Sequence, residues 1–413
     1  MKNIKKNGAN IKLEKNFDEE TYAISARPEY FPVQIKVPKT VILEPTNIVG
    51  NPTFIDEENI VWSASGSSFY KHNLESDVSE LFMDMKTKIS EVVRTVWIYK
   101  TKTINGNYNL IASVDVSEDS NRGGRIYTSV DKGVTWVKKL DLTEMGLPAH
   151  FRTSNVWANV IGNIETIVVA SYGHNNINPG VGQENGIWRS NDLGVTWVKV
   201  YEIPFVADSL VSQRHIHALT ISPNNGWIWG ANGDGGNTRK IFYSHNAIHN
   251  DTPDWNIIAS GDYGKGGWQP SGMATTALGA YFGTDSQPGY PNGILGYDLP
   301  DRTEIAKLGF KAQALNEDNL QYISRRGARI NGTEAYIPMH IGGGLSSKIF
   351  VTGDAGFSWH QATIINSAHF QVGFSTPDKD GFVYGTGMRF KVSEWETVTK
   401  WVKGRFADKE GYI

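Results

Sequence analysis

The same short pattern containing an aspartate occurs three times in the 413-residue chain. The segments SVDKGVTW from Ser129, SNDLGVTW from Ser190 and TGDAGFSW from Thr352 share the form Ser/Thr-x-Asp-x-Gly-x-Thr/Ser-Trp. A carboxylate at a fixed place could serve acid–base catalysis, but catalysis needs a single constellation, whereas a turn needs an aspartate in every copy. We therefore interpret the three copies as structural turns.

Each residue type in the pattern suits a hairpin turn. The aspartate can accept hydrogen bonds from turn amides, the glycine can adopt a positive φ, and the hydroxyl can tie the far side of the turn. The tryptophan would begin the next strand and wedge against a neighbouring sheet. The residues with these structural roles are Asp131, Gly133, Trp136, Asp192, Gly194, Trp197, Asp354, Gly356 and Trp359.

The pattern resembles the Asp-box, or BNR repeat, of sialidases and several other β-propeller families. This resemblance implies a propeller fold, in a group that includes glycan-cleaving enzymes, receptors, assembly factors and bacteriophage tail proteins. Sialidases also carry an Arg-Ile-Pro segment and an arginine triad that holds the substrate carboxylate. The chain has no Arg-Ile-Pro, since Arg27-Pro28 lacks the isoleucine, so the resemblance implies the fold more than sialidase activity.

A pair of apolar residues precedes each motif and recurs where the motif itself has decayed. The second members of the pairs are Tyr70, Tyr127, Trp188, Phe242, Leu295 and Phe350, with a weaker seventh at Phe390. Each unit reads as four short strands separated by turn residues. We expect an all-β propeller of four-stranded antiparallel blades over residues 46–404, with seven blades favoured and six as the alternative. Residues 1–45 are expected to form an extended N-terminal arm for docking, and 405–413 a C-terminal tail.

Composition sets limits on the class of protein. Forty Lys and Arg against 43 Asp and Glu give a net charge of −3, which argues against a disordered chain and against nucleic-acid binding by bulk charge. No apolar run is long enough to cross a bilayer, and no ordinary secretion signal is expected at the N-terminus. The absence of cysteine excludes disulfides and thiolate chemistry.

One face of the predicted propeller gathers arginines and long loops. The loops between second and third strands are rich in Gly, Asn and Ser, and they share a face with the starts of the innermost strands. The residues expected to bind a ligand there are Arg94, Arg152, Arg214, Arg326, Trp268, His217, His340 and His369. Guanidinium groups pair with carboxylate or phosphate, so an anionic ligand fits, while pairing with carboxylates of neighbouring blades remains the alternative.

Catalytic residues stay unassigned by the sequence. The candidates are Asp234, His217 and Glu184, because glycosidases need two carboxyl groups and polysaccharide lyases on propellers use histidine, tyrosine and arginine. No metal or cofactor is indicated, although Asp-rich and Gly-rich loops would suit Ca²⁺.

These features predict a glycan-binding protein attached to a particle such as a phage tail, acting as a receptor-binding or virion structural protein. Its expected partners are a cell-surface polysaccharide or teichoic acid-like polymer and, through the N-terminal arm, other tail proteins. A homo-oligomer is compatible, whereas nucleic acid and membrane insertion are not expected. The expected location is the virion or the cell exterior. The alternative is a glycoside hydrolase or polysaccharide lyase that uses the same face.

Overall fold

The computed structural model describes residues 3–6, 9–12, 30–92, 94–116, 123–145, 149–161, 164–173, 185–203, 215–233, 240–260, 269–286, 292–298, 308–314, 322–341, 346–365, 369–370 and 373–403. Within these ranges the chain is built of β-strands, with one short helix, α2 (Met85–Lys88), after the first sheet. Apolar residues and polar residues share each strand in the manner expected of sheets packed face to face.

Four separate sheets contain four strands each, paired antiparallel in chain order. The first sheet holds β4 (Asn51–Ile55), β5 (Ile60–Ser65), β6 (Ser68–Asn73) and β7 (Val78–Asp84). The second holds β8 (Arg94–Lys100), β9 (Leu110–Asp115), β10 (Gly124–Ser129) and β11 (Val137–Asp141). The third holds β12 (Ala149–Ile161), β13 (Ile164–Gly173), β14 (Asn185–Ser190) and β15 (Val198–Ile203). The fourth holds β16 (His215–Ile221), β17 (Ile228–Gly233), β18 (Lys240–Ser244) and β19 (Asn256–Ser260).

The next two sequence repeats merge into one nine-stranded sheet. Its strands are β20 (Pro270–Thr275), β21 (Gly279–Ser286), β22 (Asn292–Asp298), β23 (Leu308–Ala314), β24 (Tyr322–Ser324), β25 (Ala328–Arg329), β26 (Ala335–Ile341), β27 (Ser347–Thr352) and β28 (His360–Ile365). The short strand β24 joins the two halves, because Ile323 lies opposite Asp285 of β21 on one side and opposite His340 of β26 on the other.

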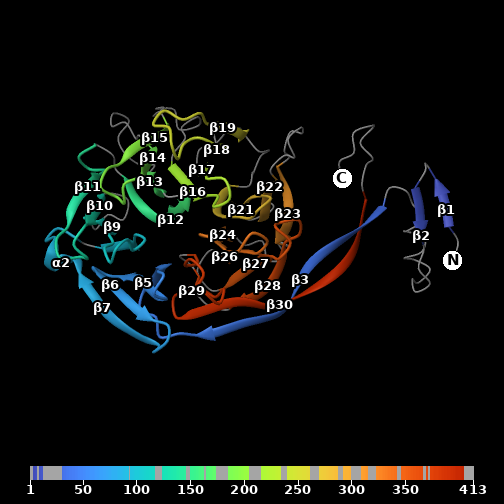
Figure 1. Cartoon of the computed structure of the whole chain (residues 1–413), viewed down its shortest axis with the longest axis horizontal. Coiled ribbons are helices and arrows are strands. Elements are labelled where there is room, and N and C mark those ends of the chain that lie inside the picture. Colours follow the sequence, from blue (N-terminus) through green and yellow to red (C-terminus); the bar gives the residue numbers. More distant parts are fainter. Residues whose placement is uncertain are drawn as a thin grey trace.

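The N-terminal and C-terminal segments together form a three-stranded sheet. It consists of β29 (Val383–Gly385), β30 (Met388–Lys403) and β3 (Tyr30–Pro45), and β3 pairs with β30 along its whole length. The paired strands extend beyond the ring of sheets as a long two-stranded ribbon (Figure 1). A separate hairpin is formed by β1 (Asn3–Lys6) and β2 (Ala9–Lys12).

The prediction of an all-β propeller with four-stranded antiparallel blades is confirmed, but the predicted blade number is wrong. Seven blades, or six as the alternative, were expected. The described residues form five blades, which are the four separate four-stranded sheets and the nine-stranded sheet; the three-stranded sheet lies beside them. The apolar pairs do mark successive repeats, since they lie in β6, β10, β14, β18, β22, β27 and β30. The pairs do not predict that β24 joins two repeats into one sheet, or that the outer strand of the last repeat is β3.

The core lies between neighbouring sheets. Trp97 of the second sheet packs in one buried cluster with Phe151 and Trp188 of the third sheet. Tyr384 of β29 packs with Val61 of the first sheet and so closes the ring. Burial of each such large side chain contributes about 1.5–3 kcal/mol, so the sheet-to-sheet contacts dominate the stability of the ring.

Candidate functional site

The three motif copies form the same turn, each between the third and fourth strands of its repeat. Asp192 shows the pattern: its Oδ1 accepts hydrogen bonds from the Thr196 amide at 2.8 Å and the Ser190 hydroxyl at 2.8 Å, and its Oδ2 accepts one from the Thr196 hydroxyl at 2.6 Å. Asp131 and Asp354 accept the equivalent three bonds. We call the end of the propeller that carries these turns the turn face.

The glycines and tryptophans of the motif also act within the turn. Gly133, Gly194 and Gly356 have φ angles of 95°, 81° and 95°, which only glycine adopts without strain. The indole nitrogens of Trp136 and Trp197 donate to the glycine carbonyls at 3.1 and 3.2 Å. Hydrogen bonds from the Thr135 hydroxyl and amide lower the pKa of Asp131 to about 2. This carboxylate is therefore ionised, and its oxygens accept hydrogen bonds within the turn.

The structure contains a fourth turn of this kind, which the aspartate pattern does not predict. Asn246, between β18 and β19, takes the place of the aspartate and accepts hydrogen bonds from the Ser244 hydroxyl at 3.0 Å and the Asp254 amide at 3.1 Å. Trp255 then donates to the carbonyl of Val200 in the third sheet at 2.8 Å. The signal in the sequence is Ser-x-Asn followed, after an insertion, by Asp-Trp.

The opposite end of the propeller is where the first strands of the repeats begin and the second strands end. We call this end the mouth. Strand register places Arg94 opposite Asp115, and His215 opposite Gly233, at this end of the second and fourth sheets. In the third sheet, Tyr172 lies opposite His150 there.

Arg94 forms an ion pair with Asp115 across β8 and β9. The Arg94 Nε donates to Oδ2 of Asp115 at 2.9 Å, and Nη2 donates to the same oxygen. The Asp115 side chain is fully buried, whereas that of Arg94 is 46% exposed. Burial raises the pKa of Asp115 to about 6, although Arg94 acts in the opposite direction. The pair therefore presents fixed guanidinium N–H groups at the mouth, with a partner that titrates near neutrality.

Two histidines and a tyrosine form a stacked cluster in the next two sheets. The Nε2 atoms of His215 and His217 lie 2.8 Å apart, and Nδ1 of His217 is 3.2 Å from the Pro270 carbonyl oxygen. The Tyr172 ring stacks on His215 with a centroid distance of 3.8 Å. Both histidines are buried, so sequence-predicted His217 sits in a defined polar cluster rather than on open surface.

The nine-stranded sheet continues the polar lining of the mouth. Gln269 donates to Asp285 at 3.3 Å at the end of β21, beside the β24 bridge. His340 lies on the other side of that bridge, with Nε2 3.5 Å from Nη2 of Arg325. Burial, together with the Arg325 charge, lowers the pKa of His340 to about 4, so its imidazole is neutral at pH 7.

Two further predicted residues point into the structure. Arg326 is buried, and its Nη1 donates to the carbonyl of Thr53 in β4 at 3.0 Å. Burial lowers the pKa of Arg326 to about 10. His369 is half-buried and its Nδ1 contacts the Thr386 carbonyl oxygen. The Arg326 contact ties this part of the chain to the first sheet, whereas the His369 contact lies within the last repeat.

The remaining candidates cannot be placed with the others. Asp234, Glu184, Arg214 and Trp268 lie outside the described residues. Arg152 lies in β12 near its start, but its side chain is outside the described part.

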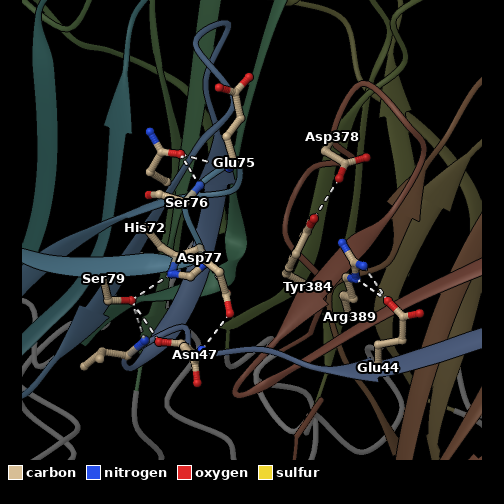
Figure 2. Close-up of polar contacts among 12 residues, drawn as sticks. Glu44, Asn47, His72, Glu75, Ser76, Asp77, Ser79, Asp378, Tyr384 and Arg389 are labelled. Atoms are coloured by element: carbon tan, nitrogen blue, oxygen red, sulfur yellow. Dashed lines mark hydrogen bonds and ion pairs between the residues drawn. The ribbon is translucent and has the colours of Figure 1, made fainter.

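A hydroxyl, an imidazole and a carboxylate also meet where the ring closes (Figure 2). His72 contacts the Ser79 hydroxyl through Nδ1 at 2.9 Å and Asp77 through Nε2 at 3.2 Å. Ser79 also donates to the Asn47 carbonyl at 3.0 Å, and the Asn47 amide donates to Asp77 at 2.6 Å. Because the Ser79 hydroxyl is held by the linker after β3, we assign this group a structural role.

An ion pair on the other side of the same linker completes this closure. Arg389 of β30 donates through Nε to Glu44 of β3 at 2.8 Å, as Figure 2 shows. We call the group Glu44, Asn47, His72, Asp77, Ser79 and Arg389 the closure latch. Within it, Asn47 joins the linker to the first sheet, and the Glu44–Arg389 pair fastens β3 to β30 in the last sheet.

Neither a complete metal centre nor a membrane helix is seen in the described part of the chain. No group of three or more His, Asp or Glu side chains is placed there to hold a metal ion. Among the same residues, none of the helices has the length and apolar character that a bilayer crossing needs.

Comparisons with known proteins give structural matches alone. No protein-family model and no curated protein matches the chain. Among solved structures, a GH74 xyloglucanase from Xanthomonas campestris matches with a TM-score of 0.48 and 13% identity over 78% of this chain and 47% of its own. The Hadza microbial sialidase Hz136 matches with a TM-score of 0.44 and 12% identity, covering 80% and 68% of the two chains.

A chain of the Mitotic Checkpoint Complex matches at a similar level, with a TM-score of 0.46, 10% identity and coverage of 87% and 96%. The chain spans about half the length of the xyloglucanase. Strand pairing, rather than these matches, defines the propeller. Function has to be argued from the residues at the mouth.

Proposed function

We propose that the chain is a glycan-binding protein that works attached to a particle such as a phage tail, and that its mouth engages a polymer on the host surface. The observation that carries this proposal is the Arg94–Asp115 pair. Its guanidinium is held by a buried carboxylate while nearly half of the arginine side chain stays open to solvent. A guanidinium fixed in this way can donate to sugar hydroxyls or phosphate without a further loss of side-chain conformational entropy.

The protonation of Asp115 bears on the kind of polymer. With a pKa of about 6, the carboxyl becomes neutral in mild acid, and the Arg94 charge is then no longer compensated. An anionic polymer, such as a teichoic acid or an acidic polysaccharide, would gain from that charge. Binding that strengthens as the pH falls from 7 to 5 is the expected behaviour for an anionic ligand.

The ribbon of β3 and β30 supports the particle-attached part of the proposal. It extends away from the ring of sheets (Figure 1). Two-stranded ribbons are marginally stable in water by themselves. We propose that this ribbon, with the N-terminal segment before it, docks onto another particle protein or onto a second copy of the chain.

Binding to immobilised polymers tests the mouth directly. Poly(glycerol phosphate), an acidic polysaccharide and neutral dextran are offered to the wild-type chain, to Arg94→Gln and to Lys132→Gln. Lys132 lies in a repeated turn at the turn face, so its variant removes one charge at the opposite end. We expect Arg94→Gln to lose binding and Lys132→Gln to keep it; equal binding by all three proteins would refute the role of the mouth.

A glycan-cleaving enzyme is the second candidate, favoured by titratable groups at the mouth. Asp115 has a pKa of about 6, within the range useful to a general acid, and His217 has its ring nitrogens in defined contacts. Incubation with acidic polysaccharides, followed by assays for reducing ends and for unsaturated products, tests this candidate. Turnover that disappears in Asp115→Asn or His217→Gln would establish cleavage, and unchanged polymer would leave binding as the function.

A further inference from the structure

We propose that His215 and His217 form a binding site for a divalent copper or nickel ion at the mouth. The two residues lie two positions apart in β16, and their side chains meet on one side of the strand although a β-bulge falls between Ile216 and Ala218. Their Nε2 atoms are 2.8 Å apart, and both side chains are buried, with 1% and 5% exposure. Imidazole nitrogen is a preferred ligand of Cu²⁺, Ni²⁺ and Zn²⁺. This inference is independent of whether the mouth binds a glycan.

The contact with Pro270 fixes the lone pair of His217. A carbonyl oxygen only accepts hydrogen bonds, so the Nδ1 of His217, at 3.2 Å from the Pro270 oxygen, must carry the proton. The Nε2 of a neutral His217 then bears the lone pair, which points toward His215. Metal-binding histidines are oriented in the same way, by donating their other ring N–H to a carbonyl oxygen or carboxylate.

Packing holds both rings in position for a shared ligand. The ring centroids of His215 and His217 are 4.7 Å apart with an angle of 25° between the planes, which puts the Nε2 atoms on facing edges. Tyr172 stacks on His215 and is nearly parallel to His217, with an interplanar angle of 6°. At Gly233 a Cβ atom would come within 2.2 Å of the His217 ring, so this position leaves room for the imidazole only because it is glycine.

The separation of the two nitrogens selects among metals. With metal–imidazole bonds of about 2.0–2.1 Å, two ligands at a right angle are about 2.9 Å apart, and two at a tetrahedral angle about 3.4 Å apart. The observed 2.8 Å is the N–H···N distance of the metal-free pair, and it is close to the separation that the right angle of square-planar or tetragonal Cu²⁺ and Ni²⁺ requires. These ions therefore need only a turn of the two rings toward a shared point. Tetrahedral Zn²⁺ would require the rings to open by about half an ångström.

The number of protons on the two imidazoles does not change when the ion binds. In the metal-free pair, His215 donates its Nε2–H to the His217 lone pair. Metal binding requires that proton to move to Nδ1 of His215, so that both Nε2 atoms are ligands and both imidazoles stay neutral. Water molecules would fill the other coordination positions.

Electron paramagnetic resonance of the Cu²⁺-loaded, untagged full chain tests the site. After removal of bound metal with EDTA, one equivalent of Cu²⁺ should give a tetragonal spectrum with coupling to two imidazole nitrogens. The variants His215→Gln and His217→Gln should each lose that coupling and the bound equivalent, while the surface variant H245Q/H249Q should keep both. Ni²⁺ should compete with Cu²⁺ better than Zn²⁺ does.

Several outcomes would overturn the site. They are a wild-type spectrum without imidazole nitrogen coupling, failure to retain one equivalent of Cu²⁺, and retention of the same signal in the two mouth variants. Thermal unfolding of each variant checks that it is folded. If the mouth variants do not fold, the wild-type spectrum decides, and a spectrum without coupling to two imidazole nitrogens refutes the site.

Discussion

The turn face and the mouth of this propeller are built in different ways. At the turn face, Asp131, Asp192 and Asp354 each accept the same three hydrogen bonds within their own turns. At the mouth each repeat places different polar residues, such as the Arg94–Asp115 pair in one sheet and the His215–His217 pair in another. A feature repeated in several units serves the shared architecture, whereas a feature found in one unit is free to serve a ligand.

The charges follow the same division. The carboxylate of Asp131 has a pKa lowered to about 2 by the Thr135 hydrogen bonds, while burial raises the pKa of Asp115 to about 6. A carboxylate saturated by hydrogen bonds is chemically inert near neutral pH. A buried carboxylate with one exposed partner can change its protonation in that range. The carboxyl group that can titrate near neutral pH therefore lies at the mouth.

The largest expected effect comes from glycine substitution at the turn face. In Gly356→Ala the new Cβ would lie 1.9 Å from the Tyr281 ring, and φ is +95°. We expect a loss of about 3 kcal/mol in the free energy of unfolding, from overpacking and backbone strain together. Urea unfolding measures it.

Gly233→Ala is the matched substitution at the mouth. Its Cβ would come within 2.2 Å of the His217 ring, but no positive φ is involved. We expect a smaller loss of stability but a loss of the Cu²⁺ signal. Equal destabilisation by the two variants would break the distinction between the two ends.

The next effect concerns the pH dependence of stability at the mouth. Because the folded-state pKa of Asp115 lies above its unfolded value, its protonation stabilises the fold in acid, and this contribution is lost as the pH rises from about 4 to 6. We expect the wild type to lose about 2 kcal/mol of stability relative to Asp115→Asn as the pH rises from 4 to 7. A difference that is constant with pH would contradict the assignment.

At the closure latch the sign is opposite. Burial lowers the pKa of His72, although Asp77 acts against that shift, so the folded state favours the neutral imidazole. The contribution of His72 is complete above its unfolded pKa and is lost as the pH falls below about 6.5. We expect the thermal stability of the wild type to decrease below this pH, by less than the Asp115 effect, and we expect His72→Gln to abolish that decrease. An unchanged acid profile would show that His72 does not titrate in the latch.

The smallest effect is expected for the exposed ion pair of the latch. Glu44 and Arg389 are 45% and 36% exposed, so solvent screens most of their attraction. We expect Glu44→Gln to lower the free energy of unfolding by less than about 1 kcal/mol, and the effect to vanish at high salt. A larger loss that resists salt would mean that the pair controls ring closure.

Much of the fold could be predicted because it repeats. The apolar pairs recur along the chain, and both these pairs and the aspartate turns lie where strand alternation and turn chemistry require. The bridging strand β24 and the pairing of β3 with β30 occur once each and join residues far apart in sequence, such as Leu43 and Phe390. Nothing local in the sequence indicates such pairings.

The site could be predicted only in part for the same reason. Arg94 and His217 were identified by their places at strand starts, and the His-Ile-His pattern at 215–217 already puts two imidazoles on one face of a strand. Their partners come from other strands: Asp115 from β9, Tyr172 from β13 and Pro270 from β20. Only the folded arrangement shows that Arg94 is paired and that Arg326 is buried.

The location of a bound polymer fragment tests the central claim most directly. A crystal structure of the chain soaked with the fragment that binds best should show it at the mouth, in contact with the Arg94 guanidinium and near the His215–His217 pair. A fragment found at the turn face, among Asp131, Asp192 and Asp354, would contradict the division of roles between the two ends.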